Sequence, residues 1–133
     1  MHTYDWAVLR VVPRVERGEC ANVGVVLYCR TLQFLQAAVD LDERRVLALD
    51  PSLDVDAVRG HLRVIEQVCA GDALAGPNAA RPQADRFHWL TAPRSTVVQP
   101  SPVHTGMTSD PATDLERLLE CMVRPPQPPP MAD

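Results

Sequence analysis

The 133-residue sequence contains no lysine, because all 13 of its basic residues are arginines. This absence excludes a lysine Schiff base and the lysine of a phosphate-binding P-loop. Aromatic residues make up only 5% of the chain, so we expect the core to use them and leave no exposed row for stacking nucleobases. The formal net charge of −4 provides no global basic field, and nucleic acid is therefore not expected as a partner.

Long hydrophobic runs are also missing. No stretch approaches the roughly 18 apolar residues of a membrane span, and the N-terminus lacks the basic region and apolar run of a signal peptide. We therefore expect a cytoplasmic protein that does not associate with a membrane.

The four cysteines lack the paired spacing of a zinc site, and no histidine lies at zinc-finger distance from any of them. We expect buried, reduced thiols, and we expect neither a metal ion nor a cofactor. The cysteines are Cys20, Cys29, Cys69 and Cys121.

The length predicts one compact domain, over residues 1–123. Residues 124–133 contain five prolines in ten positions, which predicts an extended or disordered tail.

Apolar patterns near the N-terminus predict a meander of antiparallel strands. Both faces of the first strand are mostly apolar, which favours a central strand covered on two sides, although Arg10 interrupts one face. In the second strand we expect Val23 and Val25 to share a face, and Gly24 to mark a bulge or a close backbone approach. The predicted strands are Tyr4 to Val12, Asn22 to Cys29 and Leu32 to Val39.

Capping signals predict the helices. Asp42 precedes a short helix over 43–49, and Asp54 precedes a longer amphipathic helix that ends at Gly71. Asp110, followed by proline, begins a final helix.

Two short strands are predicted after the long helix, over Phe87 to Leu90 and Ser95 to Gln99. The fold class is therefore α+β: a mostly antiparallel sheet, arranged as a meander, with the two main helices packed on one face.

Between Ala92 and Gly106 the chain places polar side chains among three prolines, which stiffen the backbone and prevent a helix. No catalytic residue is assigned there, but the segment provides candidate ligand-binding residues. They are Arg94, Ser95, Thr96, His104 and Thr105.

Two interpretations of these candidates stay open. Arg94 with the neighbouring hydroxyls is suited to binding an anion, or it ties the loop to a carboxylate such as Asp40 or Glu16. His104 is suited to general base catalysis, or its ring fixes the loop by bonding backbone groups.

Four segments together resemble the bacterial domain-of-unknown-function family 3037 (DUF3037). They read YDWAVLRVVP at 4–13, NVGVVL at 22–27, RFHWLTAPRSTVVQ at 86–99 and SPVHTG at 101–106. The resemblance extends over residues 4–123. It implies a small bacterial protein of a kind often encoded beside a HipA-like kinase, and so a possible partner, but it implies no reaction.

The first functional hypothesis is a non-enzymatic accessory module that acts with such a partner. Its candidate polar surface comprises Arg10, Arg14, Arg17 and Asn22, together with Arg94 and His104. The second is an enzyme or a nucleotide- or phosphate-binding protein, in which Arg94 and His104 reach one hollow.

Overall fold

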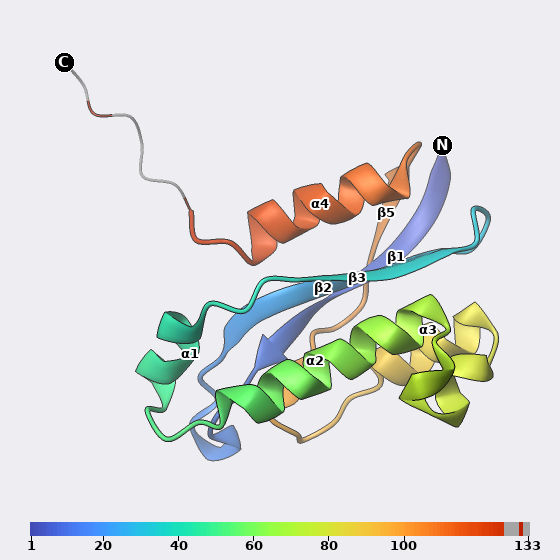
Figure 1. The fold of residues 1–133 in the computed structure, drawn as a ribbon. Coiled ribbons are helices and arrows are strands. Elements are labelled where there is room, and N and C mark those ends of the chain that lie inside the picture. The colour runs from blue at the N-terminus through green and yellow to red at the C-terminus, as the bar shows by residue number, and fades with distance from the viewer. Residues whose placement is uncertain (127–130, 132–133) are drawn as a thin grey trace.

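The computed structural model describes residues 1–126 and 131, and it shows one five-stranded antiparallel sheet with helices on both faces (Figure 1). The strands are β1 (His2–Val11), β2 (Ala21–Cys29), β3 (Phe34–Val39), β4 (Val98–Pro100) and β5 (His104–Thr108). The helices are α1 (Glu43–Leu49), α2 (Val55–Ala70), α3 (Gln83–Thr91) and α4 (Pro111–Met122). The α+β class is confirmed.

β1 is the central strand, as its two apolar faces predict. The sheet order is β3-β2-β1-β4, and β5 also pairs with β1. The first three strands form the expected meander. β4 pairs with residues 9–11 of β1 and β5 pairs with residues 2–6, so two short strands together replace one long neighbour.

A β-bulge in β2 changes which residues face which core. Leu9 pairs with Gly24 and Arg10 pairs with Asn22, which leaves Val23 as the extra residue. The expectation that Val23 and Val25 share a face is therefore wrong, because the bulge reverses the alternation.

Gly24 lies at a close backbone approach, as predicted. A Cβ atom on Gly24 would lie 2.9 Å from the carbonyl oxygen of Ala38 and 3.2 Å from Cδ1 of Leu9.

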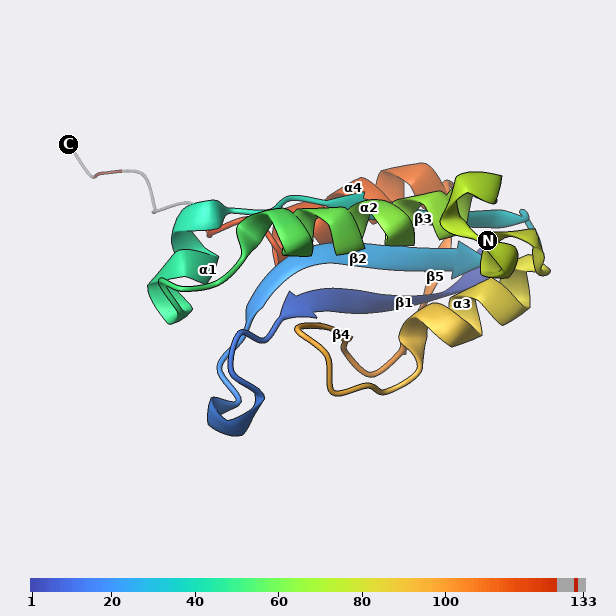
Figure 2. The same ribbon diagram turned by 60° about the horizontal axis from the view of Figure 1, so that its bottom comes forward.

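The two main helices pack on opposite faces of the sheet, which corrects the expectation that they share one. α2 and α3 bury one apolar cluster, whose largest members include Leu9, Leu62 and Phe87. α4 buries a second cluster against Leu27 on the other face. In Figure 1 α4 lies above the sheet and α2 below it, and Figure 2 shows α2 and α3 on the near face. The reason is that β1 and β2 are apolar on both faces, so a single helical layer would leave one face exposed.

Local capping sets the helix ends as predicted. Asp42 accepts hydrogen bonds from the first turn of α1, and Oδ1 of Asp54 accepts one from the amide of Ala57 at 3.0 Å. Gly71 ends α2 at a φ of +73°, where a side chain would be strained. α4 begins at Pro111 after Asp110, as predicted, but the Asp110 side chain accepts no capping hydrogen bond from the helix backbone.

The segment from Phe87 to Leu90 forms part of α3, so the predicted short strand there is wrong. Phe87 and Leu90 are three residues apart and are both buried, which is the spacing of one helical face. The Phe87 ring packs beside Tyr28 of β2, with 5.5 Å between ring centroids. Of the strand predicted over Ser95 to Gln99, only Val98 and Gln99 belong to β4, and the Val97 carbonyl also accepts a hydrogen bond from the Val12 amide.

Arg124 ties the end of α4 to the end of β3. Its Nε lies 3.0 Å from Oδ2 of Asp40, and its Nη1 reaches Glu116 and Glu120 on α4. Residues 127–130 and 132–133 of the predicted tail lie outside the described residues. None of the described helices is long and apolar enough to cross a membrane.

The close approach at Gly24 gives a first prediction. Gly24→Ala is expected to lower the free energy of unfolding by about 1–3 kcal/mol, because the added methyl group meets a backbone carbonyl. Gly60→Ala, in an open part of α2, is the control and is expected to raise it by about 0.5–1 kcal/mol. Urea unfolding of both variants measures the difference, and equal effects would contradict the packing described at Gly24.

Candidate functional site

Ser101 joins the two short strands β4 and β5 to the central strand. The amide of Val8 donates a hydrogen bond of 2.8 Å to the Ser101 hydroxyl, and the Ser101 amide donates one of 2.8 Å to the Val8 carbonyl. The hydroxyl itself donates to the carbonyl of Pro102 at 2.9 Å. The buried Ser101 side chain thus provides the acceptor that a continuous strand would have supplied at this point.

Arg94 is held against the end of α3. Its Nη2 donates to the carbonyl of Trp89, its Nε donates to the carbonyl of Ala92 at 3.3 Å, and its guanidinium carbon lies 5.1 Å from the Trp89 ring centroid. These contacts satisfy carbonyls at a helix C-terminus and add a cation–π interaction.

The two carboxylates considered as partners of Arg94 pair with other arginines. Asp40 pairs with Arg124, and Glu16 lies 3.9 Å from Arg14.

The neighbouring hydroxyls do not converge with Arg94 on one point. Thr96 donates a hydrogen bond of 2.7 Å to the carbonyl of Val98, and Ser95 is exposed and makes no hydrogen bond within the described part of the chain.

His104 and Thr105 lie on β5, against the N-terminal half of β1. The His104 ring packs on Trp6, with 4.7 Å between ring centroids and 37° between ring planes. The Thr105 hydroxyl donates to Oδ1 of Asp5 at 3.1 Å.

The structure does not bring Arg94 and His104 together. Trp6, against which the His104 ring packs, contacts the cluster beneath α4. Trp89, whose ring lies beneath the Arg94 guanidinium, contacts the cluster beneath α2. The two candidate residues therefore belong to opposite faces of the sheet, and none of the five best-formed hollows among the described residues is lined by both.

Arg10 and Asn22, two of the candidate surface residues, are brought together. Asn22 of β2 and Gln99 of β4 lie directly opposite Arg10 on its two sides, so the three side chains form a polar row across three strands. Asn22 also donates to the carbonyl of Met122, at 2.9 Å, near the end of α4.

The Arg10 guanidinium has no acceptor. Its Nε is buried and lacks a hydrogen-bond partner, and none of its nitrogens makes a hydrogen bond or ion pair within residues 1–126 and 131. Buried donors are nearly always paired, so an unpaired one requires an explanation.

Arg14 and Arg17 are separate from this row. Arg14 lies 3.5 Å from Asp50, and Arg17 pairs with Glu19 in the connection between β1 and β2. Their charges are already compensated by acidic neighbours.

The side of β1 that carries Arg10 is only partly covered by helix, because α4 packs against β2 and β3. We call this surface the β1 face. Its half-buried or exposed residues are Trp6, Arg10, Asn22, Gln99 and His104.

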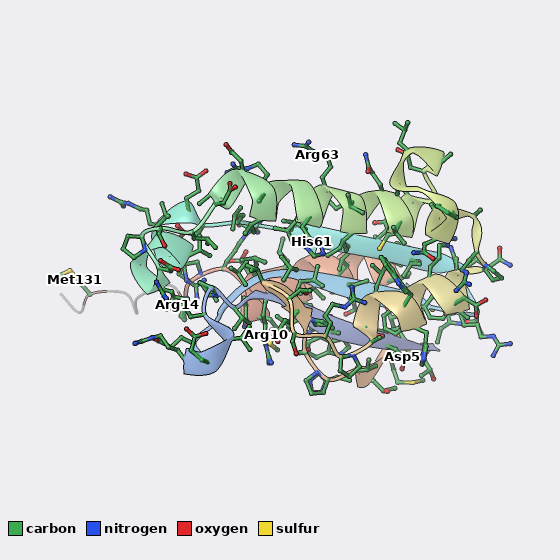
Figure 3. All side chains as sticks on the ribbon, turned by 90° about the horizontal axis from the view of Figure 1, so that it is seen from below. Asp5, Arg10, Arg14, His61, Arg63 and Met131 are labelled. Atoms are coloured by element: carbon green, nitrogen blue, oxygen red, sulfur yellow. The ribbon has the colours of Figure 1, made fainter. Side chains whose placement is uncertain are left out.

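A hollow of about 490 Å³ lies on the opposite side of the sheet, between α2, the turn before it and the segment Thr96 to Val98. Half-buried His61 lines it from α2 (Figure 3). This hollow was not predicted from the sequence, although a histidine three residues after Val58, beside the apolar stripe of α2, was a usable signal.

The pKa of His61 is lowered, first by burial and then by the positive charge of Arg94. The ring is therefore neutral at neutral pH.

The cysteines are divided between the core and the surface. Cys29 and Cys69 are buried, and burial raises the pKa of Cys69 to about 12. Cys20 and Cys121 are exposed, so the expectation of four buried thiols is wrong for these two. No group of three or more potential metal ligands is found in the described residues.

These features define a small α+β domain with an antiparallel sheet, a polar row on one face and a hollow beneath the other. The chain belongs to the family described as "Protein of unknown function (DUF3037)", whose model matches residues 6–123. No curated protein and no solved structure matches the chain.

The role of Ser101 gives a second prediction. Ser101→Ala removes the acceptor of the buried Val8 amide, so we expect a loss of about 1–3 kcal/mol in the free energy of unfolding. Ser95→Ala, at an exposed position, is the control and is expected to change it by less than about 0.5 kcal/mol. Chemical denaturation tests both, and a neutral Ser101→Ala would refute the bridging role of this hydroxyl.

The lowered pKa of His61 gives a third prediction. At His61 the unfolded chain binds a proton more readily than the folded chain. The stability that the neutral ring contributes is therefore present above its ordinary pKa of 6.5, and it is lost as the pH falls from there through the lower pKa of the folded chain. His61→Gln is therefore expected to reduce the loss of melting temperature between about pH 7.5 and about pH 5.5. His88→Gln, on the exposed side of α3, should leave that loss unchanged.

Proposed function

We propose that this protein is a non-enzymatic partner-binding module, and that its β1 face contacts an acidic segment of the partner. The single observation that carries this proposal is the Arg10 guanidinium, which lies on the central strand without an acceptor of its own. A carboxylate from a partner would pair with the terminal nitrogens of this guanidinium and form charge-assisted hydrogen bonds.

The aromatic pair of Trp6 and His104 supports the same surface. Trp6 and Arg10 point to the same face of β1 and are four residues apart, a separation of about 13 Å along a strand. Tryptophan and arginine are enriched among the residues that contribute most to protein interfaces. An extended partner segment with an apolar residue at one end and a carboxylate at the other fits this spacing.

The partner in this proposal is a HipA-like kinase encoded beside the gene, which the family resemblance implies. A bacterial origin and a cytoplasmic location are parts of the same proposal. The kinase supplies any chemistry, and this chain supplies the recognition surface.

The alternative is an enzyme or a nucleotide- or phosphate-binding protein that uses Arg94 to His104. This alternative has less support, because two Arg94 nitrogens already donate to the carbonyls of Trp89 and Ala92 and because His104 lies on the other face. It is kept as an outcome of the test.

Arg10→Met gives a fourth prediction. Binding to the purified neighbouring kinase, measured by calorimetry, is expected to weaken at least about tenfold, since a lost charge-assisted pair costs about 1.5–3 kcal/mol. Thermal stability should be unchanged or higher, because the variant also removes a buried unpaired donor. The matched control is Arg63→Met, at an exposed arginine on the outer side of α2 (Figure 3).

Two results would refute this proposal. One is the absence of a complex with the kinase, and the other is equal binding by the Arg10 and Arg63 variants. A different result would favour the alternative: ATP or inorganic phosphate stabilises the chain, and Arg94→Ala abolishes this stabilisation.

A further inference from the structure

The hollow beside α2 has the size of a small-molecule site. Its volume of about 490 Å³ lies within the range of about 300–1,000 Å³ that is typical of ligand pockets. It lies on the α2 side of the sheet, because Val58 and Val98 line it and both belong to the core beneath α2. It is therefore distinct from the β1 face.

The walls of the hollow are mostly apolar. Two secondary-structure elements, α2 and β4, and three connections contribute aliphatic side chains, so a ligand would be in contact with hydrocarbon on several sides. The apolar lining residues are Pro13, Leu53, Ala57, Val58, Val97 and Val98.

The two carboxylates of the lining are already engaged. Asp50 accepts hydrogen bonds from the amide and the hydroxyl of Ser52, at 2.9 and 2.7 Å, and lies 3.5 Å from Arg14. Asp54 caps α2 through the amide of Ala57. Both groups satisfy local donors, so neither requires a cationic ligand.

Of the remaining polar side chains that line the hollow, one has no hydrogen-bond partner among the described residues. Thr96 donates to the carbonyl of Val98. The ring of His61 makes no hydrogen bond within residues 1–126 and 131, although it is half-buried in the wall. The charged groups around this ring are Arg94, Asp50 and Asp54. A neutral imidazole provides one donor and one acceptor.

We infer that this hollow binds a small, uncharged, mostly apolar molecule with one hydrogen-bonding group, which pairs with the ring of His61. The apolar walls favour such a ligand, and the engaged carboxylates disfavour an anion without attracting a cation. This site goes beyond partner recognition by the β1 face, and it does not depend on that function.

Phenol is a suitable probe, because it combines an apolar ring with one hydroxyl donor. Titration of the full-length chain with phenol, followed by NMR of the His61 ring and the Val58 and Val98 methyl groups, is expected to show saturable shifts. For so small a ligand we expect a dissociation constant on the order of 1 mM. Benzoate and benzylamine, which add a charge to the same ring, should bind at least about tenfold more weakly, since burying an uncompensated charge is costly.

Two variants with matched controls locate the site. Ala57→Trp fills the rim of the hollow and is expected to abolish phenol binding, whereas Ala70→Trp, at an exposed alanine at the far end of the same helix, should leave it intact. His61→Phe keeps the ring but removes the hydrogen bond, so binding should weaken about fivefold, as the loss of roughly 1 kcal/mol predicts. His88→Phe should have no effect.

A pH titration gives an independent readout. Because phenol donates to the neutral imidazole, saturating phenol should lower the pKa of His61 further. Unsaturable shifts, equal binding of the charged probes, or phenol binding that survives Ala57→Trp would each overturn the inference. If the chain does not bind phenol and the Ala57→Trp variant no longer binds the kinase, the hollow is a protein contact and not a small-molecule site.

Discussion

The structure depends on one constraint, namely that β1 must be paired along both edges, while the apolar residues on both faces of the sheet must be buried by helices. β2 pairs with residues 5–11 along one edge, and the other edge is shared by β4 and β5. Both faces of the β1–β2 pair are apolar, so α2 with α3 is needed on one side and α4, which packs on β2 and β3, on the other. This arrangement fixes the positions of Arg10, His104 and the hollow. Arg10 belongs to β1, His104 lies on its neighbour β5, and the hollow is lined by its neighbour β4.

Much of the fold could be predicted because its signals are local. Asp42, Asp54 and Gly71 set the ends of α1 and α2 through contacts with residues no more than four positions away, which the sequence displays directly. The central position of β1 was predictable from its two apolar faces. A short apolar run such as 87–90 fits a strand as well as a helix, and only packing against Tyr28 and the core decides for the helix.

The arrangement of the candidate site could not be predicted, because it depends on pairing between distant segments. Arg94 and His104 are ten residues apart in a stiff segment, and the sequence analysis placed them in one hollow. Between them the chain pairs with β1 through β4 and Ser101, leaves β1 at Pro102 and pairs again through β5, and this path separates the two side chains by a sheet. Arg10 could be recognised as an anomaly in an apolar strand, but its missing acceptor is visible only once its neighbours across the strands are known.

The two proposed sites meet at β4, and the geometry indicates that they work independently. Gln99 belongs to the β1 face, whereas Val98, the preceding residue, lines the hollow on the other side. Coupling between two sites requires an element with two arrangements that both sites bias. β4 does not meet this requirement, because its ladder to β1 and the hydrogen bonds between Ser101 and Val8 hold it in one register. A one-residue shift would exchange the faces of Gln99 and Val98 and bury an amide side chain in the core. The same bonds that separate Arg94 from His104 therefore also keep the hollow and the β1 face as separate sites.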